Sequence, residues 1–460
     1  MPARKIPVAM TIAGSDSGGG AGIQADLKTF AALGVHGTVT LTAVTAQNTF
    51  SVTAIQEISL DVIEKQIDAV YEDLGIDAAK TGMLYKPEVI ELVSRKVREY
   101  GFPLVVDPVM VAKSGAPLLK PEAVEALREK LVPVAKVVTP NIPEAEILAG
   151  MSIRSLEDME RAAEAISRLG PECVVVKGGH AASADLAVDV VYIQGRVHHL
   201  SKPRIRKTTT HGTGCTFSAA IAAELAKGAE LLEAVRKAKE FVHLAIEFGL
   251  EIGRGYGPVN PMAYLYREAA RYRALRDVRE AVRILEENPV AAELAPEVGI
   301  NIAEAIPYAV GVEDVVGVPG RVRNCSGRLR AAEAPDFGGS SHLARYLLKL
   351  RELGGEFSAA INVKYSERVL QLLKERGLVV SGYDRREEPP ELKEKEGATI
   401  PWGVEEAVRR AGRIPGVIYH LGDWGKEPMI VIFGRDAREL AELVVGLAKE
   451  LKASPVTSDD

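Results

Sequence analysis

Short apolar stretches alternate with amphipathic stretches through the first 250 residues, and this alternation most restricts the fold. Apolar runs that end at Gly or a polar residue occupy residues 6–14, 37–47, 77–84, 103–110, 136–141 and 172–179. Helical patterns lie between them, for example at 60–75 and 86–101. Continuous apolar strands separated by amphipathic helices predict an α/β domain with a mostly parallel sheet and helices on both faces. Ligands bind such sheets at the carboxyl ends of the strands.

A stretch rich in Gly and Pro, residues 252–261, ends this alternation. We place the domain boundary there and expect one domain over residues 1–258 and a second, smaller α/β domain over 259–460. In the second domain the sequence predicts two helices, 263–275 and 278–287, and strands at 305–322, 357–365, 416–422 and 428–434. The charged stretch 384–397 is expected to be a solvated loop.

Composition excludes several classes of protein. The net charge is −6 with both signs interspersed, which argues against nucleic acids and membrane surfaces as partners. The chain shows neither a long apolar run nor a signal-peptide pattern, so we expect a cytoplasmic location. The three cysteines are too few and too scattered for a disulfide framework. A low share of Asn and Gln favours a thermophilic source.

The stretch HGTGCT, residues 211–216, leads directly into a helical pattern. Backbone N–H groups at this helix start, together with the helix dipole, would attract the charge on a phosphoryl group in transfer. The residues concerned are Gly212, Thr213, Gly214 and Cys215. We expect Cys215 to have a lowered thiol pKa there and to accept a proton from a substrate hydroxyl. In the alternative reading the glycines only form the turn and Cys215 fills space.

A glycine cluster, residues 14–23, follows the first apolar run and opens a helical pattern. It is neither a phosphate-binding loop of the G-x-x-x-x-G-K-[ST] type nor a clean dinucleotide fingerprint. Glycines at this place let the backbone approach a ligand closely, and Asp26 and Gln47 are positioned to face the same crevice. The alternative is a tight turn from strand to helix without a ligand.

Six motifs occur in an order that resembles the hydroxymethylpyrimidine/phosphomethylpyrimidine kinases, members of the ribokinase-like superfamily. They are TIAGSDSGGGAGIQADLKT, TAVTAQNT, DPVMVAKSG, TPNIPEAE, VVKGGH and HGTGCT, within about residues 6–250. Most ribokinase-like enzymes carry an aspartate as the base in the last motif, whereas this branch carries cysteine, as Cys215 here. The resemblance implies ATP as co-substrate, Mg²⁺ as cofactor and a homodimer.

The resemblance also implies roles for individual residues. The pyrimidine pocket would be formed by Gly14, Ala21, Asp26, Gln47 and Val109. A Gln amide complements the amine and ring nitrogen of an aminopyrimidine, as it complements adenine. The ATP phosphates and Mg²⁺ would be held by Asn141, Glu144, Lys177 and Asp107. In the alternative reading Asp107 caps a turn or a helix. His180, in the VVKGGH motif, would in the same way only form hydrogen bonds within its loop.

The implied reaction is two successive phosphoryl transfers from ATP to 4-amino-5-hydroxymethyl-2-methylpyrimidine, giving the monophosphate and then the diphosphate. The second acceptor is a phosphate oxygen that is ionised at pH 7, so it needs little help from a base. Because related enzymes accept pyridoxal, pyridoxal is the alternative substrate.

The second half has two basic stretches. Residues 318–330 place Arg321, Arg323, Arg328 and Arg330 around glycines, and guanidinium groups match phosphate oxygens. Residues 336–352 place Gly-Gly-Ser-Ser before a helix whose first turn carries His342 and Arg345, which indicates a second anion site. The alternatives are a solvated basic face for the arginines and a capping or surface role for His342.

The motifs PGRVRN, GGSSHLAR and INVKYS resemble the archaeal-type thiamine-phosphate synthase domain, over about residues 275–450. The resemblance implies that the pyrimidine diphosphate is joined to thiazole phosphate, giving thiamine phosphate and pyrophosphate. Arg321, Arg328 and His342 would be catalytic, Asn362 and Lys364 would bind the thiazole phosphate, and Asp336 and Asp423 are candidate metal ligands or turn caps. Related domains also sense thiamine phosphate in transcription regulators, so a non-catalytic sensor is the alternative.

Overall fold

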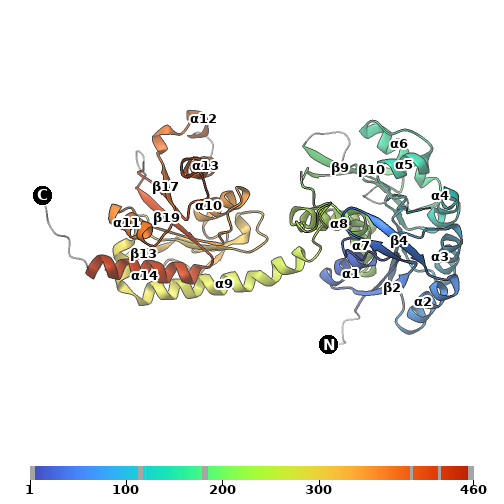
Figure 1. The fold of residues 1–460 in the computed structure, drawn as a ribbon, viewed down its shortest axis with the longest axis horizontal. Coiled ribbons are helices and arrows are strands. Elements are labelled where there is room, and N and C mark those ends of the chain that lie inside the picture. Colours follow the sequence, from blue (N-terminus) through green and yellow to red (C-terminus); the bar gives the residue numbers. More distant parts are fainter. Residues whose placement is uncertain are drawn as a thin grey trace. The chain divides into compact units, whose positions relative to one another are not determined.

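The computed structural model describes residues 6–111, 118–119, 121–178, 185–393, 397–422 and 426–453. The chain divides into two compact units, Met1–Leu265 and Tyr266–Asp460, and each is described by itself (Figure 1). Both units consist of one large sheet covered by helices.

The first unit contains an eight-stranded sheet in the order β10-β9-β8-β7-β6-β5-β1-β2. Its strands are β1 Val8–Ala13, β2 His36–Leu41, β5 Ala78–Thr81, β6 Leu104–Val106, β7 Val137–Val138, β8 Cys173–Val176, β9 Leu186–Ile193 and β10 Arg196–Pro203. All neighbouring strands from β8 to β2 are parallel, and only β9 and β10 pair in the antiparallel sense. The predicted, mostly parallel sheet is confirmed.

Helices cover both faces of this sheet because the strands are apolar on both sides. Along β1, Met10 and Ile12 pack into one layer and Ala9 into the other. The first layer contains α2 Leu60–Asp73, α3 Pro87–Tyr100, α4 Pro121–Ala126, α5 Ile142–Ala149 and α6 Leu156–Ser167. The second contains α1 Gly22–Ala32, α7 Thr213–Ala226 and α8 Leu231–Glu247. Both helices that follow the glycine-rich motifs, α1 and α7, therefore share one face.

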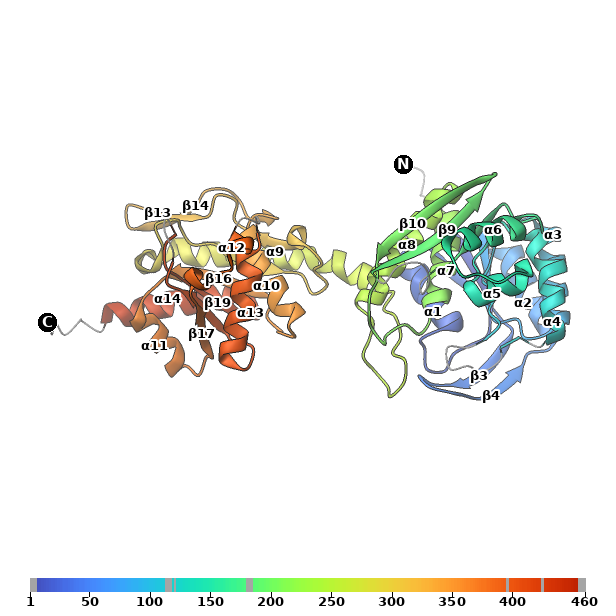
Figure 2. The same cartoon turned by 90° about the horizontal axis from the view of Figure 1, so that it is seen from above.

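The predicted strand 37–47 is two strands. Strand β2 ends at Leu41, opposite Ala13, where its partner β1 also ends. Just beyond that point the Thr42 amide donates to the Ala13 carbonyl at 3.0 Å, and the chain then leaves the large sheet. It continues as β3 (Ala43–Gln47), which pairs with β4 (Val52–Glu57) in a separate antiparallel ribbon, visible in Figure 2.

The Gly- and Pro-rich stretch around 252–261 is bonded to the body of the first unit. The amides of Tyr256, Val259 and Asn260 donate to the carbonyls of Thr49, His211 and Ala245 at 3.0, 3.0 and 2.8 Å. This stretch therefore lies against the loops that precede α7 and follow β3.

The second unit contains a seven-stranded sheet in the order β15-β12-β11-β16-β19-β18-β17. The strands are β11 Ile302–Ala305, β12 Val315–Gly317, β15 Asp336–Phe337, β16 Ala359–Lys364, β17 Val380–Tyr383, β18 Val417–His420 and β19 Met429–Gly434. A separate ribbon is formed by β13 (Val322–Cys325) and β14 (Arg328–Ala331). The predicted strand 305–322 is wrong, since Pro307 and Gly311 interrupt it between β11 and β12.

Two helical layers cover this second sheet as well. One contains α9 Ala263–Glu287, α11 Glu367–Glu375 and α14 Ala437–Ala453, and the other contains α10 Ser341–Glu352 and α13 Thr399–Ala411. The short helix α12 spans Pro390–Lys393, within the stretch predicted as a loop. The two helices predicted at 263–275 and 278–287 are one helix, α9, because Arg276 and Asp277 between them are compatible with a helix interior.

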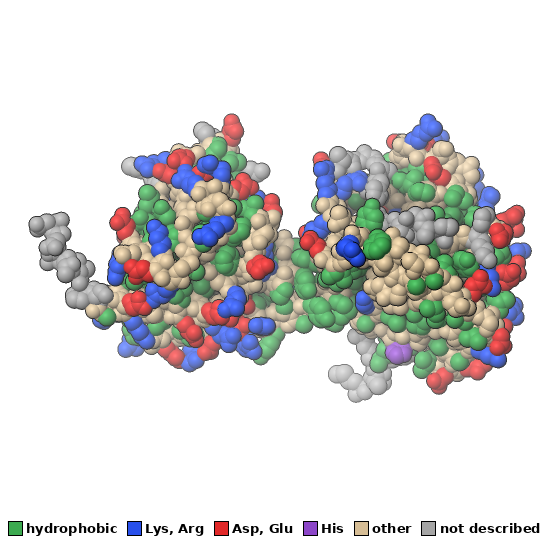
Figure 3. Space-filling model, in the orientation of Figure 1, with side chains coloured by type: hydrophobic (Ala, Val, Ile, Leu, Met, Phe, Trp, Pro, Cys, Tyr) green, Lys and Arg blue, Asp and Glu red, His purple; other side chains and the backbone are tan. Residues whose placement is uncertain are grey.

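Acidic and basic side chains are interspersed over the visible face of each unit (Figure 3). Among the described residues, no helix has both the length and the apolar character needed to cross a bilayer.

Candidate active sites

Asp16 organises the glycine-rich turn that follows β1. Its Oδ1 accepts a hydrogen bond from the Gly18 amide at 2.8 Å, and its Oδ2 accepts from the amides of Gly20 and Ala21 at 3.0 and 2.8 Å. Burial would raise the pKa of Asp16, but these donors and His211 lower it below its usual value. The carboxylate is therefore the fixed centre of the turn, a role that sequence reasoning missed.

The start of α7 lies directly against this turn. Gly212 has φ of +81°, and a Cβ added to it would lie 1.8 Å from the carbonyl oxygen of Gly20. Only glycine fits there, both in conformation and in space. The structure thus brings the two glycine motifs, residues 14–23 and 211–216, into direct contact.

Gly214, in the first turn of α7, lies next to Asp107 and Lys177. A Cβ at Gly214 would be 3.4 Å from Asp107 Oδ2 and 3.4 Å from Lys177 Nζ. Lys177 donates to Asp107 Oδ1 at 3.1 Å, and the Ser218 hydroxyl donates to Asp107 Oδ2 at 3.3 Å. The hydroxyl of Thr213 donates to the Thr210 carbonyl at 2.8 Å. Gly214 therefore faces an ion pair formed by the buried Asp107 carboxylate and the partly exposed Lys177 ammonium group.

Asn141 and Glu144 form a reciprocal cap at the start of α5. The Asn141 side chain accepts from the Glu144 amide at 2.9 Å, and the Glu144 carboxylate accepts from the Asn141 amide at 2.8 Å. Burial raises the pKa of Glu144 to about 7, with Lys177 opposing and Asp107 adding to this effect. Asn141 and Glu144, both predicted from the sequence, therefore lie in the same polar cluster as Asp107 and Lys177.

The donor set near α5 fits Mg²⁺. The described residues contain no group of three or more His, Cys, Asp or Glu side chains that would form a complete protein cage for a metal. Mg²⁺ typically uses only one or two carboxylates, with water and substrate phosphates as its other ligands. Asp107 and Glu144 are two carboxylates that act on one another electrostatically, and the nearby Gly214 backbone lies at the predicted phosphate site.

The thiol of Cys215 corrects one expectation from the sequence. Burial raises its pKa to about 11, and Asp26 and Asp107 add to this effect, while Lys80 and the Gly22 amide act against it. The predicted lowering of the pKa is wrong, because desolvation outweighs the helix start. Cys215 therefore carries its proton at neutral pH.

Asp26 lies in α1 with its carboxylate completely buried. Lys80, on β5, donates to both carboxylate oxygens, at 2.9 and 3.1 Å, and the Thr11 hydroxyl donates at 2.6 Å. Burial raises the pKa of Asp26 despite these partners. Sequence reasoning missed Lys80, although a lysine within the apolar strand Ala78–Thr81 is the kind of signal that marks a buried charge.

The other residues predicted to bind the pyrimidine lie near the glycine-rich turn. Gly14 packs against Met83, and Val109 packs against the small apolar cluster that contains Met83. Gln47 is held through its backbone amide, which donates to the Ser17 hydroxyl at 2.7 Å, and its side-chain nitrogen lies 3.4 Å from Nε2 of His211. His211 was also missed, although it directly precedes Gly212. His180 lies outside the described residues.

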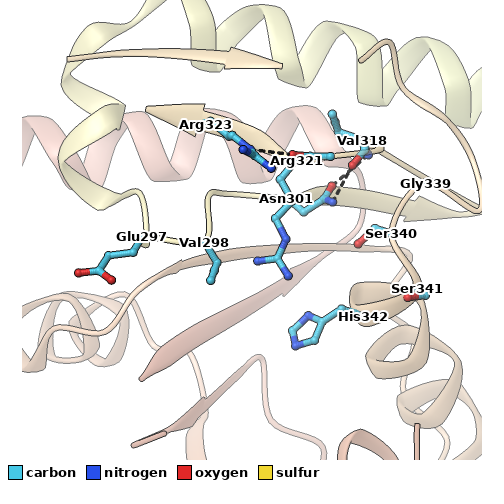
Figure 4. Close-up of a pocket in the computed structure, with 11 residues that line it drawn as sticks. Glu297, Val298, Asn301, Val318, Arg321, Arg323, Gly339, Ser340, Ser341 and His342 are labelled. Carbon is cyan, nitrogen blue, oxygen red and sulfur yellow. Dashed lines mark hydrogen bonds between the residues drawn. The ribbon is translucent and has the colours of Figure 1, made fainter. Parts of the chain in front are cut away.

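The second unit contains a cavity of about 570 Å³ between the start of α10 and the turn before β13 (Figure 4). Its lining is mostly polar and includes two arginines, one histidine and one acidic residue. The lining residues are Glu297, Val298, Asn301, Val318, Gly320, Arg321, Arg323, Gly339, Ser340, Ser341 and His342.

Arg321 and His342 point into this cavity from opposite sides (Figure 4). Arg321 has φ of +70°, an uncommon conformation for a residue with a side chain, which places it among the strained residues often found at functional sites. Burial lowers the pKa of His342 to about 3, and the charge of Arg321 adds to this lowering. The cavity therefore presents cationic guanidinium beside a neutral imidazole, a combination suited to an anionic ligand.

Other predicted residues of the second half lie elsewhere. Arg328 is exposed on β14, opposite Cys325, and does not line the cavity. Lys364 is exposed at the end of β16, and Asp336 is exposed on β15. Asp423 lies outside the described residues.

Asn362 is buried, and both ends of its amide are occupied. It accepts from the Asn301 amide at 2.7 Å and donates to the Gly299 carbonyl at 3.1 Å. Asn301 in turn joins β11 to the Val318 backbone at 2.9 and 3.0 Å. These bonds give Asn362 a part in shaping the cavity wall, which sequence reasoning did not anticipate.

Comparisons with known proteins agree with both halves. Residues 16–260 match phosphomethylpyrimidine kinase, and residues 277–446 match thiamine-phosphate synthase ThiN. A hydroxymethylpyrimidine/phosphomethylpyrimidine kinase of Bacillus subtilis is 49% identical over 257 residues, which cover 56% of this chain and 95% of that protein. The thiamine biosynthesis bifunctional protein ThiED of Geobacter sulfurreducens is 50% identical over 252 residues, covering 55% of this chain and 51% of that protein.

Among solved structures, the ADP complex of Bacillus subtilis pyridoxal kinase is similar, with a TM-score of 0.53 and 43% identity. The match covers 56% of this chain and 98% of that chain. The resemblance inferred from the motifs is confirmed: the chain belongs to the phosphomethylpyrimidine kinase family and carries a thiamine-phosphate synthase ThiN domain behind its kinase half.

Proposed function

We propose that this protein makes thiamine phosphate in two stages. Residues 1–258 would phosphorylate 4-amino-5-hydroxymethyl-2-methylpyrimidine twice with ATP, and residues 259–460 would join the resulting diphosphate to thiazole phosphate with release of pyrophosphate. The observation that carries the proposal is the contact of Gly212 with Gly20, which joins the turn proposed to bind the pyrimidine to the helix start proposed to bind phosphate. The two family matches support one stage each.

In the kinase half, the amides of residues 212–215 would hold the negative charge that spreads over the transferred phosphoryl group. The ammonium group of Lys177 would neutralise phosphate oxygens near Gly214. Asp107 and Glu144 would hold Mg²⁺, which supplies charge neutralisation on the nucleotide phosphates when it is bound. Each group acts by position and charge, as phosphoryl transfer requires.

The acceptor hydroxyl would lie near Cys215. The raised pKa means that the thiolate, the form able to accept a proton, is scarce at neutral pH. Cys215 would therefore limit the first transfer, in which an alcohol must lose its proton, more than the second, in which the acceptor oxygen is already ionised.

In the synthase half, Arg321 and the start of α10 would bind the diphosphate and stabilise departing pyrophosphate. Neutral His342 would lie beside the same group, able to donate or accept one hydrogen bond. We favour synthase over sensor because the chain itself makes the diphosphate that this cavity would consume. The roles of Arg328, Asn362 and Lys364 stay predictions.

Incubation of the intact protein with ATP, Mg²⁺, the pyrimidine alcohol and thiazole phosphate tests both stages together. We expect thiamine phosphate as the product. If the pyrimidine diphosphate accumulates instead, and supplying it directly also gives no thiamine phosphate, the second half is a sensor and the synthase proposal is wrong.

Pyridoxal is a second candidate substrate for the kinase half, because the similar ADP-bound structure is a pyridoxal kinase. Comparing kcat/KM for the two alcohols on the same preparation decides between them. We further propose a homodimer in the cytoplasm, where the three free cysteines would stay reduced. The oligomeric state can be measured by light scattering.

A further inference from the structure

His211 connects the two glycine motifs of the kinase half through its side chain. Its Nε2 lies 2.9 Å from Oδ2 of Asp16, and the two side chains are only 11% and 2% exposed. The same carboxylate oxygen accepts the amides of Gly20 and Ala21. His211 thus reaches from the residue preceding the phosphate site to the centre of the pyrimidine-side turn.

The backbone of His211 is fixed independently of its ring. Its amide donates to the Gly257 carbonyl at 3.0 Å, and its carbonyl accepts from the Val259 amide at 3.0 Å. The ring also packs on the turn, since a Cβ at Gly20 would lie 2.5 Å from Cδ2 of His211. With its backbone fixed and its ring packed on the turn, His211 has little freedom to break its bond to Asp16 without moving one of the motifs.

We propose that His211 is a positioning residue for phosphoryl transfer: its bond to Asp16 holds the pyrimidine-side turn in register with the helix start that binds the transferred group. The inference rests on the proposed kinase function. His211 would act through Asp16 and Gln47, whose amide nitrogen is 3.4 Å from the same ring atom, rather than by touching the reacting atoms.

The hydrogen bonds of Asp16 show how a positioning role of His211 can be distinguished from support of the turn itself. Among the described residues, His211 provides the side-chain donor to Asp16, whereas three backbone amides provide the rest. Loss of the imidazole therefore leaves the turn with its own three bonds and removes the side-chain link from Asp16 to the helix start, together with the approach of the ring to Gln47. Reacting groups must stay aligned within a fraction of an ångström, so a loosened link should lower kcat.

The test uses the full chain and three variants. His211→Phe keeps a ring of similar size without a donor, His211→Gln keeps an N–H donor, and Asp16→Asn removes the acceptor charge. His199→Phe is the matched control. His199 lies on exposed β10, and its Nε2 is likewise 2.8 Å from a carboxylate, that of Glu160.

We expect His211→Phe to lower kcat for both phosphoryl transfers by about 10- to 100-fold, the effect of losing one charge-assisted hydrogen bond, with KM for ATP little changed. His211→Gln should recover most of the rate. The double variant with Asp16→Asn should be no slower than the slower single variant, because both remove the same link. Multiplied losses, no rescue by Gln, or full activity of His211→Phe would each overturn the proposal.

Hydrogen exchange provides a readout that needs no substrate. In His211→Phe the amides of residues 16–21 and of residues 212–216 should both exchange faster, while those of β10 do not. In His199→Phe neither of the first two segments should change. Unchanged exchange in His211→Phe would show that the Asp16–His211 bond does not connect the two motifs. If instead the wild-type protein fails to phosphorylate the pyrimidine, the proposed function is wrong, and the exchange result alone decides whether the bond connects the motifs.

Discussion

Lys80 and Asp26 form a buried ion pair beneath the start of α7, with Nζ 2.9 Å from the nearer carboxylate oxygen and neither side chain exposed. Asp26, and to a lesser degree Cys215 and Asp107, raise the pKa of Lys80, overcoming the opposing effect of burial. Lys80 in turn lowers the pKa of the Cys215 thiol, against burial. One buried cation thus acts both on Asp26, which is proposed for the pyrimidine pocket, and on Cys215, which is proposed for the phosphate site.

Replacement of Lys80 by Met should destabilise the first unit by about 3–5 kcal/mol, because it leaves the Asp26 carboxylate buried without its partner. Urea unfolding followed by circular dichroism measures this loss. Both tryptophans of the chain belong to the second unit, so the fluorescence transition should not move. Lys65→Met is the control: that lysine pairs with Asp61 on the surface, at 73% and 70% exposure, and should cost under about 1 kcal/mol. Equal losses in the two variants would contradict the prediction.

The rate of the first phosphoryl transfer should rise with pH between 7 and 9 if the Cys215 thiolate accepts the proton. With a pKa of about 11, the thiolate fraction grows roughly tenfold for each pH unit in this range. Cys215→Ala should remove this dependence and lower the first transfer by about 100-fold, with a smaller loss in the second. A wild-type rate that does not change with pH, or equal losses in both transfers, would show that the thiol only shapes the phosphate site.

Gly212→Ala should abolish kinase activity, because its Cβ would lie 1.8 Å from the Gly20 carbonyl oxygen. Gly228→Ala is a close control: Gly228 has φ of +83°, nearly that of Gly212, but a Cβ there meets nothing within 4 Å. That variant should lose about 1–2 kcal/mol of stability from backbone strain and keep its activity. Steady-state kinetics of both variants at matched folded concentration make the comparison, and similar activity in the two would contradict the packing argument.

Arg321→Ala should lower synthase activity by about 100- to 1,000-fold, whereas Arg328→Ala should change it by less than about threefold. The reason is position: Arg321 lines the cavity and Arg328 does not. The assay supplies the pyrimidine diphosphate and thiazole phosphate directly, so kinase activity does not enter. A larger effect at Arg328 would place the active cavity elsewhere.

The second unit should lose stability as the pH falls from about 6.5 towards 3. The pKa of His342 is lowered to about 3 and that of His420 to about 4, mainly by burial, so the folded state binds fewer protons than the unfolded chain in this range. The stabilising effect of the neutral imidazoles is therefore present above pH 6.5 and lost as the pH falls. Tryptophan fluorescence during urea unfolding should show that His342→Asn loses less stability than the wild type between pH 6.5 and 4.

The layered sheet of the first unit was predictable because each apolar run is long enough, and distinct enough from its neighbours, to specify a buried strand. The direct contact of Gly212 with the glycine-rich turn was not predicted, because it depends on how the start of α7 packs against that turn. The pKa of Cys215 did not follow: a helix start is visible in sequence, whereas desolvation depends on what covers the thiol. Lys80 was missed for a related reason, because its partner Asp26 is 54 residues away.

The bonds between residues 256–260 and the loops of the first unit also determine how the two halves can be separated. A protein cut after residue 258 would lose the bonds that Val259 and Asn260 donate to His211 and Ala245. It would then lack part of the support for the start of α7. A weak kinase activity in such a fragment would therefore say little about cooperation between the halves. Fragments that end near residue 265 retain those bonds, so they are the appropriate standard against which the intact chain should be compared.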